Sequence, residues 1–141
     1  MGYESRSRRD KTITVDREQV CPFLLRLFLS NTRHSDLERY SRHEFPKNEL
    51  QIYTWHDATL KELSALIREV NEDSRKKGTV LEFSSVYADN FKPTFRMRTI
   101  GSTCVAKPSN EDNVTLGSKH FVIGDYIDVA IISPRGSRRY S

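Results

Sequence analysis

Residues 49–70, ELQIYTWHDATLKELSALIREV, combine an apolar strand, a short corner and an amphipathic helix. Residues 50–55 are rich in β-branched and aromatic side chains, which favours a strand. After the corner, apolar residues recur on one side of a helix. A strand that leads into a helix with a single apolar face indicates a small α+β domain, because that face must pack on a sheet. The apolar stripe consists of Leu60, Leu63, Leu66, Ile67 and Val70.

The start of this helix is marked by its polar residues. Thr59 and Glu62 have the spacing of a capping box, in which each side chain accepts a hydrogen bond from a backbone N–H of the first turn. Asp57 adds a negative charge at the positive end of the helix dipole. We therefore predict a helix that begins after Thr59 and ends near Asn71.

The positive charge of the chain is concentrated at its two ends. The 141 residues carry a net charge of +4, of which residues 1–11 contribute +2 and residues 133–141 contribute +3. Residues 12–132 are therefore close to neutral. Both ends are rich in Ser and Arg and poor in apolar residues, which is typical of disorder. We predict a disordered basic arm at 1–15, a folded domain at 16–134 and a disordered basic tail at 135–141.

The most apolar run of the chain is CPFLLRLFL at residues 21–29, which we interpret as a strand. Its second face carries Leu24, Arg26 and Phe28, and two of these three residues are apolar. An antiparallel strand with one face in water would have polar residues there. Either another segment of the chain or a partner protein must cover this face. The first face carries Phe23, Leu25, Leu27 and Leu29.

The remaining pattern predicts a polar loop at 31–47, strands at 81–87, 95–100, 121–123 and 126–132, and a single helical turn at 114–116. We expect Gly101 to end the strand before it. One main helix across a mixed sheet, with the first and last strands central and parallel, describes the ubiquitin-like β-grasp fold. No stretch of about 18 apolar residues is present, so we expect no membrane span.

The sequence contains no arrangement of residues that indicates catalysis. Asp125 and Asp128 lie among turn residues, where Asp is common for local hydrogen bonding. His34 and His43 lack the neighbouring ligands of a metal site. The two cysteines form no CxxC pair. We therefore expect no enzymatic activity, no cofactor and no bound metal.

A protein-binding surface is the better hypothesis. Interfaces are often anchored by Tyr, Trp and Arg, and the outer face of the first two strands would carry such residues. A direct RNA-binding module that uses the basic arms is the alternative, but the near-neutral domain argues against it. The predicted partner-binding residues are Leu24, Arg26, Phe28, Tyr53 and Trp55.

Five segments resemble the family of the eighteen-kilodalton Sin3-associated polypeptide. They are DREQVCPFLLRLF, ELQIYTWHDATLKEL, RKKGT, IGST and IGDYIDVAI, and the resemblance covers about residues 16–134. It implies a ubiquitin-like fold with loop insertions and no enzymatic activity. The tail does not end in Gly-Gly, so conjugation to other proteins is not implied.

The same resemblance implies two sets of partners. Members of this family join the Sin3–histone deacetylase corepressor, which represses transcription. They also join a complex with Acinus or Pinin and a serine-rich RRM protein that acts in mRNA splicing. Localisation in the nucleus follows, with nuclear speckles and a cytoplasmic pool as finer expectations. We therefore expect a non-enzymatic adaptor whose contact with RNA is indirect or through its arms.

Overall fold

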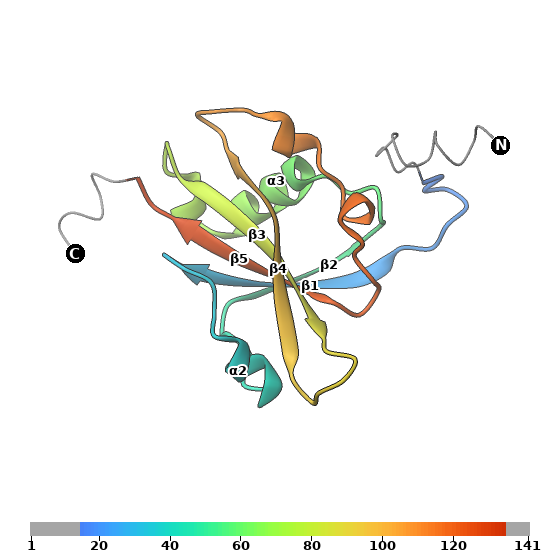
Figure 1. Cartoon of the computed structure of the whole chain (residues 1–141). Helices are drawn as coiled ribbons and strands as arrows, with labels where there is room; N and C mark the ends of the chain where they lie inside the picture. Colours follow the sequence, from blue (N-terminus) through green and yellow to red (C-terminus); the bar gives the residue numbers. More distant parts are fainter. Residues whose placement is uncertain (1–14, 135–141) are drawn as a thin grey trace.

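The computed structural model describes residues 15–134, which form a curved five-stranded sheet with α3 across one face (Figure 1). The expected disorder of residues 1–15 and 135–141 falls outside the described residues, except for Val15. Among residues 15–134, none of the helices has the length and apolarity that crossing a membrane requires. In chain order the elements are β1 (Phe23–Asn31), α2 (Leu37–Ser41), β2 (Glu49–Thr54), α3 (Leu60–Val70), η1 (Asp73–Arg75), β3 (Val80–Ala88), β4 (Phe95–Cys104), η2 (Asn110–Asn113), η3 (Gly117–Lys119) and β5 (Tyr126–Ile132).

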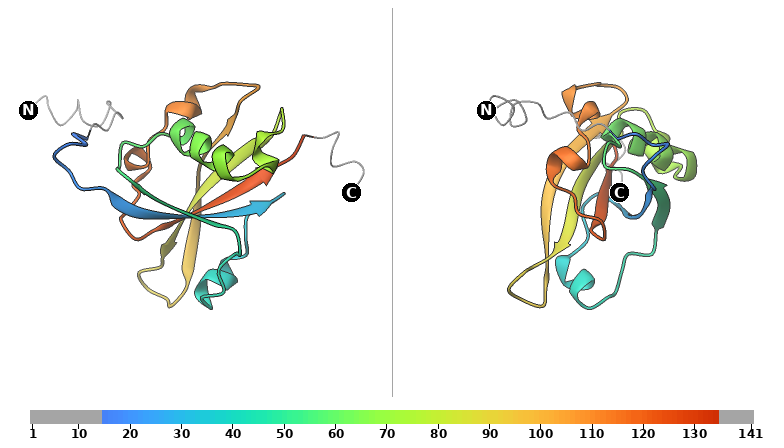
Figure 2. Two further views of the ribbon diagram at one scale, coloured as in Figure 1. Left: turned by 180° about the vertical axis from the view of Figure 1, so that it is seen from behind. Right: turned by 90° about the vertical axis from the view of Figure 1, so that its right-hand side faces the viewer.

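The strand order is β2-β1-β5-β3-β4. β1 and β5 pair in parallel, and all other neighbours are antiparallel. The first and last strands are therefore inner and parallel, as predicted, and the α+β ubiquitin-like architecture is confirmed. Figure 2 shows the consequence from behind and from the side: α3 lies across one half of the twisted sheet, and α2 lies near its opposite end.

Helix α3 begins where the capping pattern places it. The Thr59 side chain accepts a hydrogen bond from the Glu62 N–H at 3.1 Å. The predicted capping box is half formed, because the Glu62 carboxylate binds Arg17. Within the stripe, the prediction is wrong for Val70, whose side chain is 61% exposed. The fully buried members are Leu60, Leu63 and Ile67.

Two apolar clusters lie on opposite faces of the sheet. The larger one packs α3 against β1, β3 and β5, and it includes Leu25, Leu63 and Val129. The smaller one contains Phe28, Tyr40 and Val86. The segment between β1 and β2 supplies much of this second cluster, so the predicted polar loop at 31–47 in fact contains a helix with a buried tyrosine.

Strand β4 continues to Cys104, so the prediction that Gly101 ends it is wrong. A bulge opposite Phe83 and Ser84 lets the strand pass through this glycine. A Cβ atom on Gly101 would lie 2.8 Å from Cδ1 of Leu60, so the glycine allows α3 to approach the sheet closely. The predicted strand at 121–123 is not formed, and the predicted turn at 114–116 is replaced by η2 and η3 on either side.

Candidate partner-binding surface

The five predicted partner residues lie on or next to the face of β1 and β2 that points away from α3. Leu24 pairs with Tyr53 in the β1–β2 register, and Phe28 pairs with Glu49. The Leu24 and Tyr53 side chains are 41% and 69% exposed. These two apolar residues are therefore neighbours that a partner can reach.

Phe28 is not accessible, and its prediction as a partner residue is wrong. Its side chain is fully buried beneath the insertion between β1 and β2. The Phe45 ring stacks on it with a centroid distance of 5.3 Å, and the Tyr40 and Tyr126 rings meet it edge-on. This half of the face is covered by the protein's own chain, which was one of the two alternatives that the alternation allowed.

Arg26 covers the same aromatic cluster. Its guanidinium lies 5.1 Å from the ring centroid of Phe28 and 5.0 Å from that of Phe45. It also forms an ion pair with Glu49 on the adjacent strand. The hydrogen bond to Glu49 raises the pKa of Arg26. Arg26 therefore forms the boundary between the covered and the open parts of the face.

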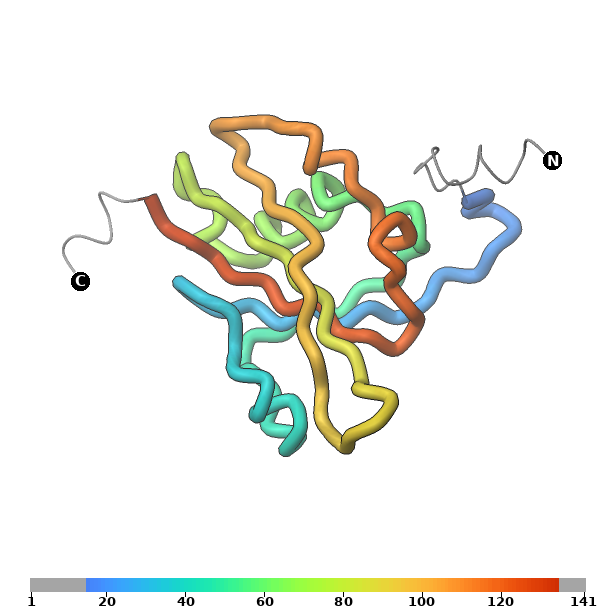
Figure 3. The backbone as a smooth tube through the Cα atoms, viewed as in Figure 1, coloured from blue at the N-terminus to red at the C-terminus, as the bar shows by residue number. Residues whose placement is uncertain are grey.

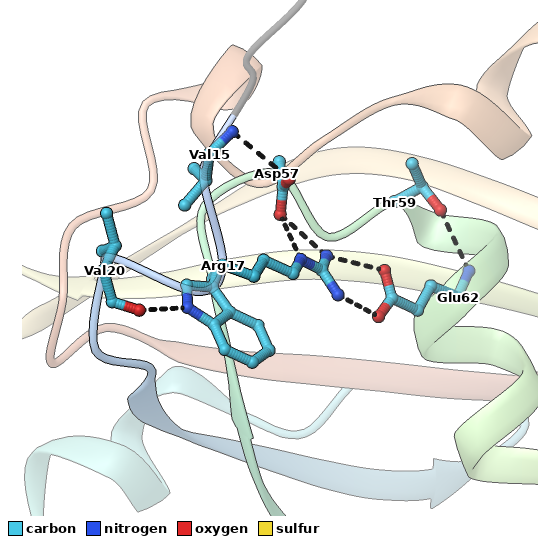
Figure 4. A network of polar contacts seen from close by, with 7 residues as sticks. Val15, Arg17, Val20, Asp57, Thr59 and Glu62 are labelled. Atoms are coloured by element: carbon cyan, nitrogen blue, oxygen red, sulfur yellow. Dashed lines mark hydrogen bonds and ion pairs between the residues drawn. The ribbon is translucent and has the colours of Figure 1, made fainter.

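Trp55 is partly covered by the segment that precedes β1. Figure 4 shows Arg17 of this segment reaching Asp57 and Glu62. Its Nε1–H donates a hydrogen bond of 2.7 Å to the carbonyl of Val20. The Arg17 guanidinium lies 4.6 Å from the ring centroid and bridges Asp57 at 2.7 Å and Glu62 at 3.1 Å. The carboxylates predicted to stabilise the start of α3 thus also hold this segment in place.

What remains open is a small apolar surface, which we call the β1–β2 patch. It consists of Val20, Leu24 and Tyr53, and the Val20 side chain is 49% exposed. β2 is an edge strand, so the patch borders a strand with one unpaired side. Of the five predicted residues, Leu24 and Tyr53 belong to this patch, whereas Arg26 and Trp55 lie at its margins.

A buried carboxylate lies in the interior strand β5. Asp128 is fully buried and accepts a hydrogen bond of 2.5 Å from the Tyr40 hydroxyl. Its other oxygen lies 2.7 Å from Nδ1 of His34 and 3.4 Å from the Ser35 N–H. The assignment of Asp128 to a turn is therefore wrong. A lone carboxylate inside the apolar strand YIDVAII is the sequence signal that could have revealed it.

His34 connects Asp128 to β3, which resembles the order of groups in a Ser-His-Asp site. Its Nε2 lies 3.3 Å from Oγ of Ser84 and 3.2 Å from Glu82. The Ser84 side chain is 1% exposed, so its hydroxyl is inaccessible to a substrate. This arrangement therefore attaches the α2 insertion to the sheet. Among residues 15–134, no group of three or more His, Cys, Asp or Glu side chains is arranged to hold a metal ion.

Both titratable partners of Asp128 have a raised pKa. Burial lowers the pKa of His34, but the hydrogen bond and charge of Asp128, together with Glu82, outweigh it, so the pKa is raised. Burial also raises the pKa of Tyr40, and the adjacent Asp128 carboxylate adds to that effect. The tyrosine therefore stays a neutral hydrogen-bond donor at physiological pH.

Comparison with known proteins adds a family match. The model of the family described as Sin3 associated polypeptide p18 matches residues 14–131. The chain is 49% identical over 140 residues to histone deacetylase complex subunit SAP18 from Homo sapiens, covering 95% of this chain and 92% of the human one. The Drosophila melanogaster protein of that name is 49% identical over 120 residues, which cover 85% of this chain and 80% of the fly one.

A plant protein of the same name is also similar. The Arabidopsis thaliana chain is 42% identical over 134 residues, covering 92% of this chain and 87% of its own length. All three relatives are named as subunits of a complex and not as enzymes. This agrees with the buried Ser84 and with the absence of a catalytic arrangement in the sequence.

Proposed function

Because this chain belongs to the Sin3 associated polypeptide p18 family, we propose that it is a non-enzymatic adaptor subunit of a histone deacetylase corepressor complex. The observation that carries this proposal is the 49% identity over 140 residues to relatives named as histone deacetylase complex subunits. Such a role places the protein in the nucleus, in transcriptional repression. Adaptors act by binding, which is consistent with an open apolar patch beside a compact core.

We extend the proposal to the finer assignments that the five resembling segments imply. The corepressor is the Sin3–histone deacetylase complex, and a second complex contains Acinus or Pinin and a serine-rich RRM protein that acts in splicing. Nuclear speckles and a cytoplasmic pool follow from the second complex. Recovery of these proteins with the tagged chain from nuclear extract, identified by mass spectrometry, tests each assignment separately.

We assign the partner contact to the β1–β2 patch. Leu24 and Tyr53 provide a cross-strand pair with exposed apolar area, which suits an anchor residue of a partner. Phe28 is excluded from this role because its burial makes it part of the second core. Arg26 and Trp55 are held at the margins by intramolecular contacts and border the site.

The test is a double variant, Leu24→Ser with Tyr53→Ser, compared with the full-length wild-type chain. Recovery of the deacetylase complex should fall by about tenfold or more, because anchor residues typically contribute over about 1 kcal/mol each. The matched control is Phe91→Ser with Val122→Ser, which replaces two apolar residues that are 93% and 63% exposed elsewhere. The control should recover the complex normally.

Two outcomes contradict different parts of the proposal. Equal recovery by the patch variant and the control would exclude the patch as the contact. Failure of the wild-type chain to recover any deacetylase subunit would exclude the adaptor function itself. Circular dichroism and thermal melting of both variants verify that the fold is retained.

A further inference from the structure

A second surface lies at the carboxyl end of α3, away from the β1–β2 patch. The turn that follows α3 and the segment that follows β4 lie side by side at one end of the molecule (Figure 3). Between them is a cleft with a volume of about 520 Å³. The side chains that matter for its chemistry are Arg68, Arg75, Lys76, Lys77, Val105 and Ala106.

The charged residues that line this cleft are all positive. Four cationic residues line it, and no Asp or Glu is among the lining residues. One of them, Lys76, lies 3.9 Å from Asp73, which is a weak exposed pair. Within residues 15–134, no ion pair joins Arg68, Arg75 or Lys77 to a carboxylate. The cleft is therefore positive although the domain as a whole is near neutral.

The backbone that carries these cations is already ordered by local hydrogen bonds. Arg75 donates to the carbonyls of Arg68 at 2.5 Å and Glu69 at 2.9 Å, and so completes the carboxyl end of α3. The Ser74 hydroxyl donates to the carbonyl of Asn71 at 2.7 Å. A ligand that binds here would lose less affinity to ordering of the protein than at a mobile loop.

Two aliphatic residues, Val105 and Ala106, also line the cleft. Val105 is 65% exposed, and Ala106 and the buried Thr79 lie beside it. No aromatic ring is among the lining residues, and single-stranded nucleic acids usually need one for base stacking. The aliphatic and cationic residues that line the cleft together match a peptide that has an apolar residue next to acidic ones.

The cleft continues along α3 into a second hollow of about 250 Å³, which shares Arg68 and Val105 with it. Lys61 and Asp112 line this extension, so its charge is mixed. An extended peptide that crosses both hollows would place its acidic residues over the turn after α3.

We propose that this cleft binds an acidic peptide segment of a partner protein. An aliphatic or aromatic side chain of the peptide packs on Val105, and neighbouring carboxylates lie over the four cationic residues that line the cleft, Lys76 and Lys77 among them. The surface is separate from the β1–β2 patch, so its failure would leave the adaptor proposal unchanged. An adaptor with two such surfaces could hold two partner segments at once.

The test measures fluorescence anisotropy of a labelled ten-residue peptide, a central Leu-Phe pair with four acidic residues on each side, against the full chain. Lys76→Glu with Lys77→Glu should weaken binding about tenfold or more, because attraction is replaced by repulsion. Val105→Ser should weaken it severalfold. The matched control, Lys47→Glu with Lys92→Glu, makes the same change in net charge at two exposed lysines outside the cleft and should bind like wild type.

A second peptide tests whether the cleft recognises the apolar residues or only the negative charge. A peptide with Ser-Ser in place of Leu-Phe should bind severalfold more weakly, and equal binding would overturn the proposal. The proposal would also be overturned if the Lys76→Glu, Lys77→Glu variant and the Lys47→Glu, Lys92→Glu control lost binding equally. A ten-nucleotide oligouridine that binds more tightly than the peptide, with Lys76 and Lys77 required, would assign the cleft to nucleic acid instead. No measurable binding of the acidic peptide to the wild-type chain would also overturn it.

Discussion

The carboxylate of Asp128 joins residues that are far apart in the sequence. His34 and Tyr40 bind it across separations of 94 and 88 residues. A fully buried carboxylate is unfavourable unless its oxygens are hydrogen-bonded, so these contacts offset the loss of water around Asp128. They also anchor α2 over Phe28. Asp128 thus helps to hold the segment that, with its aromatic side chains, covers this part of the sheet.

His34 should make stability depend on pH. Its folded pKa lies above the unfolded value of 6.5, so its charged form contributes stability fully below pH 6.5, and the contribution is lost as pH rises through the folded pKa. The stability difference between wild type and His34→Gln should therefore be larger at about pH 6 than at about pH 9. The change should be about 1 kcal/mol, the usual difference between a charged and a neutral hydrogen bond.

Urea unfolding at the two pH values measures this difference. His43→Asn serves as the control, because His43 is exposed and Asn tolerates its positive φ of 60°. The control should show no comparable dependence on pH. A His34→Gln difference that stays constant, or grows, between pH 6 and pH 9 would contradict the charged pair with Asp128.

Helix α3 has a narrower buried stripe than the periodicity predicts. Leu60, Leu63 and Ile67 are completely buried, whereas Val70 at the carboxyl end extends beyond the edge of the core. On the opposite margin, Ser64 is buried and shares a hydrogen bond of 2.6 Å with Thr103 of β4. The buried face of α3 is thus displaced toward β4 relative to the apolar stripe. The pattern of apolar residues could not indicate this displacement.

Two variants of this stripe should separate buried from exposed positions. Leu63→Ala should lower the free energy of unfolding by about 2–5 kcal/mol, because it leaves a cavity between α3 and the sheet. Val70→Ala should change it by no more than about 0.5 kcal/mol, since this side chain is 61% exposed. Chemical denaturation compares the two directly. Equal effects of the two substitutions would contradict the observed orientation of α3.

At the level of the whole molecule, β5 is the strand that connects the two halves of the sheet. It pairs with β1 on one side and β3 on the other, and its residues Ile127–Ile131 are all buried. β2 and β4 each have one strand neighbour. The surfaces proposed for partners lie toward the less protected parts of this arrangement, at β2 and after β4.

This order predicts the pattern of amide hydrogen exchange. Amides of β5 should exchange most slowly, since they open only when the sheet separates, and amides of β2 should exchange at least about tenfold faster. Exchange followed by NMR on the full chain resolves both strands. Protection of β2 equal to that of β5 would indicate that β2 is not an edge strand in solution, and would argue against an open β1–β2 patch.

Local patterns predicted much of the fold and less of the surface. The cap at Thr59, the bounds of α3 and the last strand all follow from residues within a few positions of one another. The helix within residues 31–47 was missed because its five residues are too few for a periodic signal. Of the five predicted partner residues, Leu24 and Tyr53 are openly exposed, and Phe28 is not.

The sequence by itself determined many of the side chains that avoid water: most of the stripe of α3, the first face of β1 and the apolar strand β5. It also determined the order of the elements, from which the ubiquitin-like topology follows. Only the tertiary structure decided which segment covers each apolar face. The alternation of apolar residues along a strand indicates that a face is buried, but it does not indicate which part of the chain covers that face. The segment that contains α2 covers Phe28, and Arg17 covers Trp55. Both depend on contacts between residues that are far apart in the sequence, and these contacts exist only once the sheet has assembled.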